Sequence, residues 1–78
     1  MIQRAPVDLA GHVTDRLHEV GYYTFEYRLT RQSAACVVVR QATDSVPLAE
    51  LRKALAARFA VTLVPDRVDP RLEVRSMP

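Results

Sequence analysis

Two histidines and an aspartate recur at regular spacing near the start of the chain, at His12, Asp15 and His18. On a helix, residues three apart are turned about 60° from one another, so the two histidines would lie about 120° apart. A metal ion needs ligands that converge at roughly 2 Å, and the usual helical pair of histidines is spaced i and i+4. The spacing therefore favours two surface histidines, and we predict no metal site.

The cysteine Cys36 lies in the apolar stretch AACVVV. A cysteine nucleophile needs an electropositive, partly exposed setting that lowers its pKa, whereas burial raises the pKa. Asp15 and Glu19 are four residues apart, as on an exposed helix face, and the two glycines of the chain form no phosphate-binding loop. We therefore expect no catalytic residues, no cofactor and no enzymatic activity.

The composition is that of one folded domain over residues 1–78, with a core at about residues 7–65 and a tail or edge strand at 66–78. The chain is 49% hydrophobic and 26% charged, as in ordinary globular proteins. Its net charge is only +2, and its basic residues are interspersed with acids, whereas nucleic-acid binding draws on clustered basic residues. Nucleic acid is therefore an unlikely partner, and a homodimer or a larger protein partner is expected to cover some of the apolar surface.

No segment of the sequence has the pattern of a membrane span or of a signal peptide. The longest uninterrupted apolar stretch, Ala34–Val39, is far shorter than the roughly 20 residues that cross a bilayer. The opening residues, MIQRAPVD, contain no apolar segment of the signal-peptide kind. A single cysteine cannot form an internal disulfide. We therefore expect a cytoplasmic protein that does not enter a membrane.

A helix is predicted between Asp8 and Gly21. Residues 1–7 precede it as an expected short edge strand or arm, since Pro6 cannot donate to a ladder. Asp8 is suited to cap the helix, and Gly21 to end it in the left-handed conformation. Four apolar residues fall on one helical stripe, namely Leu9, Val13, Leu17 and Val20.

After Gly21 the apolar period changes to two, which is typical of a strand. The inward positions are predicted to be Tyr23, Phe25, Tyr27 and Leu29. The polar segment TRQS then leads to AACVVVRQ, which is apolar on both faces from Ala34 to Val39. Such a strand lies inside its sheet with both faces covered. Helices can cover one face, and we expect another protein surface to cover the other.

The second half of the chain predicts one more helix and one or two strands. ATDSVP is expected to start the helix, with Asp44 or Ser45 as its cap. Its buried stripe is Leu48, Leu51, Leu55 and Phe59. VTLVP is the next strand, and RLEVRS adds an edge strand or remains a tail. This (β)αββαβ order predicts an α+β, ferredoxin-like two-layer sandwich with both helices on one face of an antiparallel sheet.

The outward positions of the aromatic strand and of the strand AACVVVRQ form the expected interface. They are Tyr22, Thr24, Glu26, Arg28, Ala34, Cys36, Val38 and Arg40. RNA-binding sheets stack bases on outward aromatic side chains. Only Tyr22 among the clustered aromatics is predicted to face outward, and AACVVVRQ has no aromatic residue. The pattern favours core packing over base stacking.

The stretches DLAGHV, LHEVGYYTFEY and AACVVVRQ resemble an ACT domain over about residues 1–65. That family has an Asp-x-x-Gly before its first helix, usually with a proline where Ala10 stands here. The resemblance implies a dimeric regulatory module that binds a small, amino-acid-like ligand near the glycine. The ligand-binding residues implied are Asp8, Leu9, Ala10, Gly11 and His12. The competing interpretation is that Asp8 caps the helix and Gly11 eases helix packing.

The stretch LAELRKALAARFAVTLVP is similar to the C-terminal lid domain of adenylate-forming ligases of the phenylacetate-CoA ligase type. Those enzymes carry a lysine beyond the last strand, and the tail DRVDPRLEVRSMP has none. This second resemblance implies a detached or accessory lid-like domain. Three hypotheses therefore stand: a non-catalytic binding module that acts through its sheet face, an accessory piece of a ligase, and a small phage-type inhibitor of a larger complex.

Overall fold

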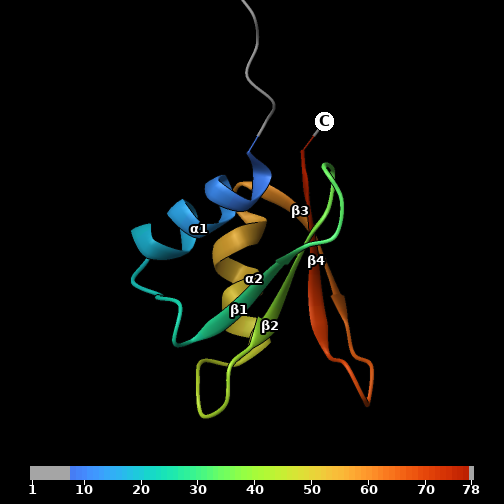
Figure 1. Cartoon of the computed structure of the whole chain (residues 1–78). Helices are drawn as coiled ribbons and strands as arrows, with labels where there is room; N and C mark the ends of the chain where they lie inside the picture. The colour runs from blue at the N-terminus through green and yellow to red at the C-terminus, as the bar shows by residue number, and fades with distance from the viewer. Residues whose placement is uncertain (1–7, 78) are drawn as a thin grey trace, which may run out of the picture.

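The computed structural model describes residues 8–77. It is a small α+β structure with two helices and a four-stranded antiparallel sheet (Figure 1). The elements in chain order are α1 (Leu9–Glu19), β1 (Tyr27–Arg31), β2 (Val37–Gln41), α2 (Leu48–Ala56), β3 (Phe59–Val64) and β4 (Arg71–Ser76). The strand expected at residues 1–7 lies outside the described residues.

The C-terminal strand β4 occupies an inner position, because the strand order is β1-β2-β4-β3. Val74 is paired with Val37 on β2 and with Val61 on β3, antiparallel to both. Strands β2 and β3 therefore run parallel to each other, with β4 between them. The expectation of an edge strand or tail at residues 66–78 is wrong. Since Leu72 and Val74 are fully buried, the core also extends beyond residue 65.

One hydrophobic core joins both helices to the sheet. The strands contribute alternate residues, among them Val37, Val39, Leu72 and Val74. The helices contribute Leu9, Val13, Leu17, Leu48, Leu51 and Leu55. Figure 1 shows the two helices on the same side of the strands. Phe59 is buried as predicted, but it begins β3 because α2 already ends at Ala56.

Both ends of α1 follow the predicted signals. The Asp8 side chain accepts a hydrogen bond from the backbone N–H of Gly11 at 2.9 Å, which satisfies one free amide of the first turn. Gly21 adopts a φ of +96°, in the left-handed region that other residues avoid. Val20 departs from the prediction: it is the C-cap residue and 39% exposed, so the buried stripe ends at Leu17.

Replacing Asp8 by alanine is expected to lower the free energy of unfolding by about 1 kcal/mol, because the first turn loses its cap. Urea denaturation at neutral pH measures the change. Asp15→Ala is the matched control, since Asp15 is an exposed carboxylate on the same helix. Equal losses in the two variants would show that the cap contributes nothing.

The segment between α1 and β1 is a loop, not the start of a strand. The backbone N–H of Glu26 donates to the Tyr23 carbonyl at 2.8 Å, and the Glu26 carboxylate accepts from the Tyr23 N–H. This turn interrupts the alternation, so the prediction that Tyr23 and Phe25 face the core is wrong: they are 49% and 70% exposed. Tyr22, predicted to face outward, is half-buried against the core. Tyr27 is buried as predicted.

Two other loops differ from the expected boundaries. The connection between β1 and β2 spans residues 32–36, where the N–H groups of Gln32 and Ser33 both donate to the Cys36 carbonyl. Helix α2 has Pro47 as its N-cap residue, with no side-chain cap. Asp44 instead adopts a φ of +61°, and the Ser45 hydroxyl donates to the Phe25 carbonyl at 2.7 Å. The predicted caps therefore shape the loop before α2.

Candidate functional site

The candidate site is the outer face of the sheet, on the side away from the helices. Its strand positions alternate with the core residues and comprise Arg28, Thr30, Val38, Arg40, Ala60, Thr62, Val64, Arg71, Glu73 and Arg75. Asp69, in the connection between β3 and β4, lies against this face through Arg40. Four arginines thus face two carboxylates, which leaves an excess of two positive charges. We call this surface the outer face.

An ion-pair network organises the outer face. Arg40 binds Asp69 through two parallel hydrogen bonds, from Nε to Oδ1 at 2.7 Å and from Nη2 to Oδ2 at 3.0 Å. Arg71 reaches Asp69 Oδ2 at 3.5 Å and Glu73 Oε2 at 3.2 Å. Arg75 lies 3.7 Å from the other oxygen of Glu73. The network fixes the rotamers of long side chains that would otherwise be mobile.

The connection between β3 and β4 holds Asp69 in place. The carboxylate of Asp66 accepts hydrogen bonds from the backbone N–H groups of Val68 at 2.7 Å and Asp69 at 3.1 Å. These backbone bonds lower the pKa of Asp66 below its ordinary value. The hydrogen bond from Arg40, with the nearby charges of Arg71 and Arg28, likewise lowers the pKa of Asp69.

The lowered pKa of Asp69 makes part of the stability pH-dependent. Its contribution is present in full above the unfolded-state pKa, about 3.9, and is lost as the pH falls through the lower folded-state value. Wild type is therefore expected to be more stable than Asp69→Asn at neutral pH, with a gap that narrows below about pH 4. Urea midpoints between pH 2 and 7 measure the gap, with Asp15→Asn as control. A gap that stayed constant down to pH 2 would contradict the prediction.

Val38 lies on the outer face and is buried by its own chain, without a second molecule. Only 2% of this residue is exposed, although it alternates with the core residues Val37 and Val39 and faces away from the helices. Its cross-strand neighbours are Thr30 and Glu73. Long side chains cover apolar surface with their methylene groups while their charged ends stay in water. The chain therefore covers both faces of β2 by itself, and burial of β2 does not require a second molecule.

A hollow of about 280 Å³ lies at one end of the outer face. Arg28 and Arg40, opposite each other on β1 and β2, form one side of it. The loop after β2 and the connection between β3 and β4 complete the lining with Gln41, Ala42, Thr43, Asp44, Val68, Asp69 and Pro70. The hollow therefore combines guanidinium groups, carboxylates and apolar side chains.

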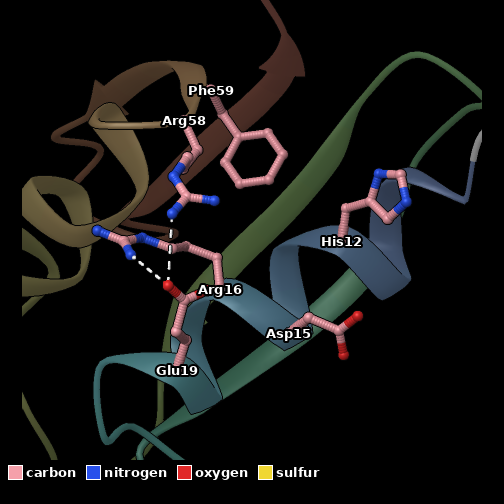
Figure 2. Close-up of a pocket in the computed structure, with 6 residues that line it drawn as sticks. All are labelled: His12, Asp15, Arg16, Glu19, Arg58 and Phe59. Atoms are coloured by element: carbon pink, nitrogen blue, oxygen red, sulfur yellow. Dashed lines mark hydrogen bonds and ion pairs between the residues drawn. The ribbon is translucent and has the colours of Figure 1, made fainter.

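A second hollow, of about 270 Å³, lies between α1 and the start of β3 (Figure 2). Glu19 Oε1 accepts hydrogen bonds from Arg16 at 3.3 Å and from Arg58 at 3.4 Å. Both guanidinium groups are therefore already paired with a carboxylate. Figure 2 shows His12 and Asp15 directed away from that cluster. The side chains do not converge on a common point, and the hollow is a weaker candidate.

The five residues predicted to bind a ligand have separate roles in the structure. Asp8 caps α1 and also binds Arg31 at 3.2 Å, and Leu9 is buried in the core. A Cβ atom on Gly11 would meet the Asp8 carboxylate, so this glycine lets the cap fold over the helix end. Ala10 packs against the core, and His12 is exposed. The capping interpretation of Asp8 therefore accounts for these contacts.

The predicted interface residues are divided between strands and loops. Arg28, Val38 and Arg40 lie on the outer face, and Cys36 is buried just before β2. The other four, Tyr22, Thr24, Glu26 and Ala34, lie in loops. The sequence-based set omitted Asp69, Arg71, Glu73 and Arg75. Its only signal for these was the alternation of Leu72 and Val74 with charged residues.

Three further side chains, Cys36, Tyr27 and His18, carry reactive groups. Cys36 is buried, in agreement with the prediction. Burial raises the pKa of the Tyr27 phenol, and a hydrogen bond with Thr14 partly offsets this effect. The phenol oxygen lies 3.5 Å from Nε2 of His18.

Within residues 8–77, no three His, Cys, Asp or Glu side chains are grouped so that they could hold a metal ion. Neither helix in this range has the length and apolar character of a membrane span.

Comparison with known proteins identified no protein similar to this chain. A scan against protein-family models, a search of curated proteins and a search of solved structures each gave no significant match to this chain.

Proposed function

We propose that this protein is a non-catalytic binding module that acts through its outer face, and that its partner is a protein with an acidic surface. The observation that supports this most is the excess of arginine on the outer face, where Arg28, Arg40, Arg71 and Arg75 face only Asp69 and Glu73. Guanidinium groups bind carboxylates through paired hydrogen bonds, which gives orientation as well as affinity.

The ion-pair network supports this proposal because it lowers the entropic cost of binding. A flexible arginine loses rotamer freedom when a partner immobilises it. Arg40 and Arg71 are already held by Asp69, and their side chains are only 29% and 24% exposed. Few additional side chains therefore lose rotamer freedom when a partner binds the outer face. Arg28 and Arg75 remain more exposed and are the arginines best placed to reach it.

The charge of the outer face favours an acidic protein over a second copy of this chain. Two outer faces laid together would bring two positive surfaces into contact, which is unfavourable. Nucleic acid is disfavoured for a different reason: none of the outward strand positions carries an aromatic residue on which a base could stack. An excess of two charges is also small for binding driven by phosphates.

We also propose that the fold is a ferredoxin-like sandwich in which β4 lies between the two parallel strands β2 and β3. The unit β2–α2–β3, with β4 inserted between its parallel strands, has the order of a split βαβ motif. The regulatory role implied by the ACT-like resemblance, the accessory ligase role and the inhibitor role all require a partner. Each is compatible with an exposed sheet face.

Affinity capture with charge-reversed variants tests the proposed function. The chain is immobilised as wild type, as Arg75→Glu and as Arg52→Glu, and exposed to extract of its native cells. Arg75 lies on the outer face with a half-exposed side chain, and Arg52 is exposed on α2. We expect a captured protein with an acidic surface to be retained by wild type and Arg52→Glu and lost from Arg75→Glu.

Two outcomes would contradict the proposal. In the first, all three forms capture the same proteins, so the outer face contributes nothing. In the second, only Arg52→Glu loses the partner, which would place the binding surface on the helices. Light scattering of the purified chain adds a separate check. A stable dimer that Arg75→Glu disrupts would show that the outer face binds a second copy of this chain and not an acidic partner.

A further inference from the structure

Arg28 is the outer-face arginine whose hydrogen-bonding groups are not used by the residues that the structure describes. It lies directly opposite Arg40 on the neighbouring strand. Like charges at such cross-strand positions repel each other. Arg40 is compensated by its two hydrogen bonds to Asp69, whereas Arg28 makes no side-chain hydrogen bond or ion pair with any residue in the range 8–77. An anion placed beside Arg28 would relieve the repulsion and satisfy its donors.

The hollow next to this pair has an apolar rim that is held in position. Val68 is 93% exposed, although its backbone N–H is bound by the Asp66 carboxylate at 2.7 Å. Pro70, which has a fixed φ, lies beside it in the lining. The connection between β3 and β4 thus presents an apolar side chain to solvent at the edge of the hollow that Arg28 and Arg40 line. A ligand that fits both features carries an anionic group next to an apolar one.

The two aspartates of the hollow limit how much negative charge it accepts. Asp69 already binds Arg40 and Arg71, and Asp44 also lines the hollow. A polyanion that extends past Arg28 would approach these carboxylates and be repelled. A single carboxylate bound at Arg28 brings one negative charge near them, whereas a run of phosphates brings several. The arrangement therefore favours an isolated acidic group over a run of phosphates.

We propose that the hollow beside the Arg28–Arg40 pair binds one carboxylate carried by an apolar peptide segment of the partner protein. This inference rests on the proposed function and specifies the group that is recognised. Arg28 donates to the carboxylate, Arg40 adds positive charge from the opposite strand, and Val68 and Pro70 contact the apolar neighbour. The carboxylate belongs either to a glutamate or aspartate side chain or to a chain terminus.

Backbone amide shifts in a nuclear magnetic resonance titration test the site. The first probe is an acetylated and amidated hexapeptide with one glutamate between leucines, and the second replaces that glutamate by glutamine. A third keeps the glutamine but has a free C-terminal carboxylate. We expect saturable shifts at Arg28, Arg40, Thr43 and Val68 with the glutamate peptide, and about tenfold weaker binding of the glutamine peptide. Stronger binding of the third peptide would identify a chain terminus as the source.

Variants establish which side chain carries the recognition. Arg28→Gln is expected to weaken binding of the carboxylate peptide about tenfold, whereas Arg52→Gln removes the same charge from α2 and should change it less than about twofold. Both arginines are exposed, so both variants are expected to fold. Asp44→Asn should strengthen binding of a 12-nucleotide single strand, because it removes a repelling carboxylate.

Several results would overturn the inference. Absence of saturable shifts at the hollow, or equal losses in Arg28→Gln and Arg52→Gln, would show that no carboxylate site exists there. If wild type bound the oligonucleotide more tightly than the peptide, the partner would be nucleic acid and not a protein. Shifts confined to residues 71–75 that Arg75→Gln abolishes would leave the proposed function in place and refute only this site. Shifts confined to the helices would refute both.

Discussion

Replacing Leu72 by alanine is expected to lower the free energy of unfolding by about 2–5 kcal/mol. Leu72 is fully buried on β4, opposite Val39 on one side and Leu63 on the other. Truncation removes buried methyl groups and leaves a cavity at the centre of the sheet. In a domain of this size such a loss is a large fraction of the total stability. Urea or thermal denaturation measures it.

The control for this prediction is Ser76→Ala, at the exposed end of the same strand. It should change stability by less than about 0.5 kcal/mol. If Leu72→Ala were as mild as Ser76→Ala, β4 would be a peripheral strand or a tail. That result would also remove the basis for Arg71, Glu73 and Arg75 as parts of one surface, since β4 places them there.

Val38→Ala is expected to cost about 1.5 kcal/mol, because two buried methyl groups are lost from the outer face. The stability of wild type should also be the same over a hundredfold range of protein concentration. Both expectations follow from the burial of Val38 by side chains of its own chain. Coverage by a second copy would instead make the stability rise with concentration through mass action.

Thr30→Ala is the matched control for Val38→Ala, since Thr30 is the cross-strand neighbour of Val38 and is exposed. It should have little effect on stability. A negligible cost for Val38→Ala, together with stability that rises with concentration, would show that Val38 is exposed in the monomer and covered on association. The sequence-based expectation of a dimer would then be the better explanation for the apolar strand.

Local signals predicted the first helix and its limits well. The stripe of Leu9, Val13 and Leu17 is buried, Asp8 caps the helix, and Gly21 has the positive φ that its position suggested. These features depend on interactions within a few residues, so they can be inferred from spacing and residue type. The class of fold, with two helices and an antiparallel sheet, followed from the order of such segments.

The position of β4 could not be inferred in the same way. Leu72 and Val74 alternate with arginines and a glutamate, which is the pattern of a half-buried strand. That pattern indicates which residues share a face of the strand but not which strands lie beside it. Strand order is set by contacts between segments that are distant in the sequence. The insertion of β4 between β2 and β3 moved the charged residues to the centre of the outer face.

The aromatic segment shows a different limit. Tyr23 and Phe25 alternate with polar residues as in a strand, yet the turn closed by Glu26 interrupts the ladder. The rings instead stack on each other at 6.0 Å between centroids, with large exposed fractions. Val38 is a further case, since it is buried although it alternates with the core residues and lies on the outer face. Neither outcome has a signature in the local sequence.

Chemical footprinting of the arginines shows whether the partner binds the outer face. Phenylglyoxal modifies exposed guanidinium groups, and mass spectrometry reports each position in the free chain and in the complex captured from native cells. We expect Arg28 and Arg75 to lose reactivity in the complex while Arg52 keeps it. Protection of Arg52 with unchanged reactivity at Arg28 and Arg75 would contradict it and place the partner on the helices.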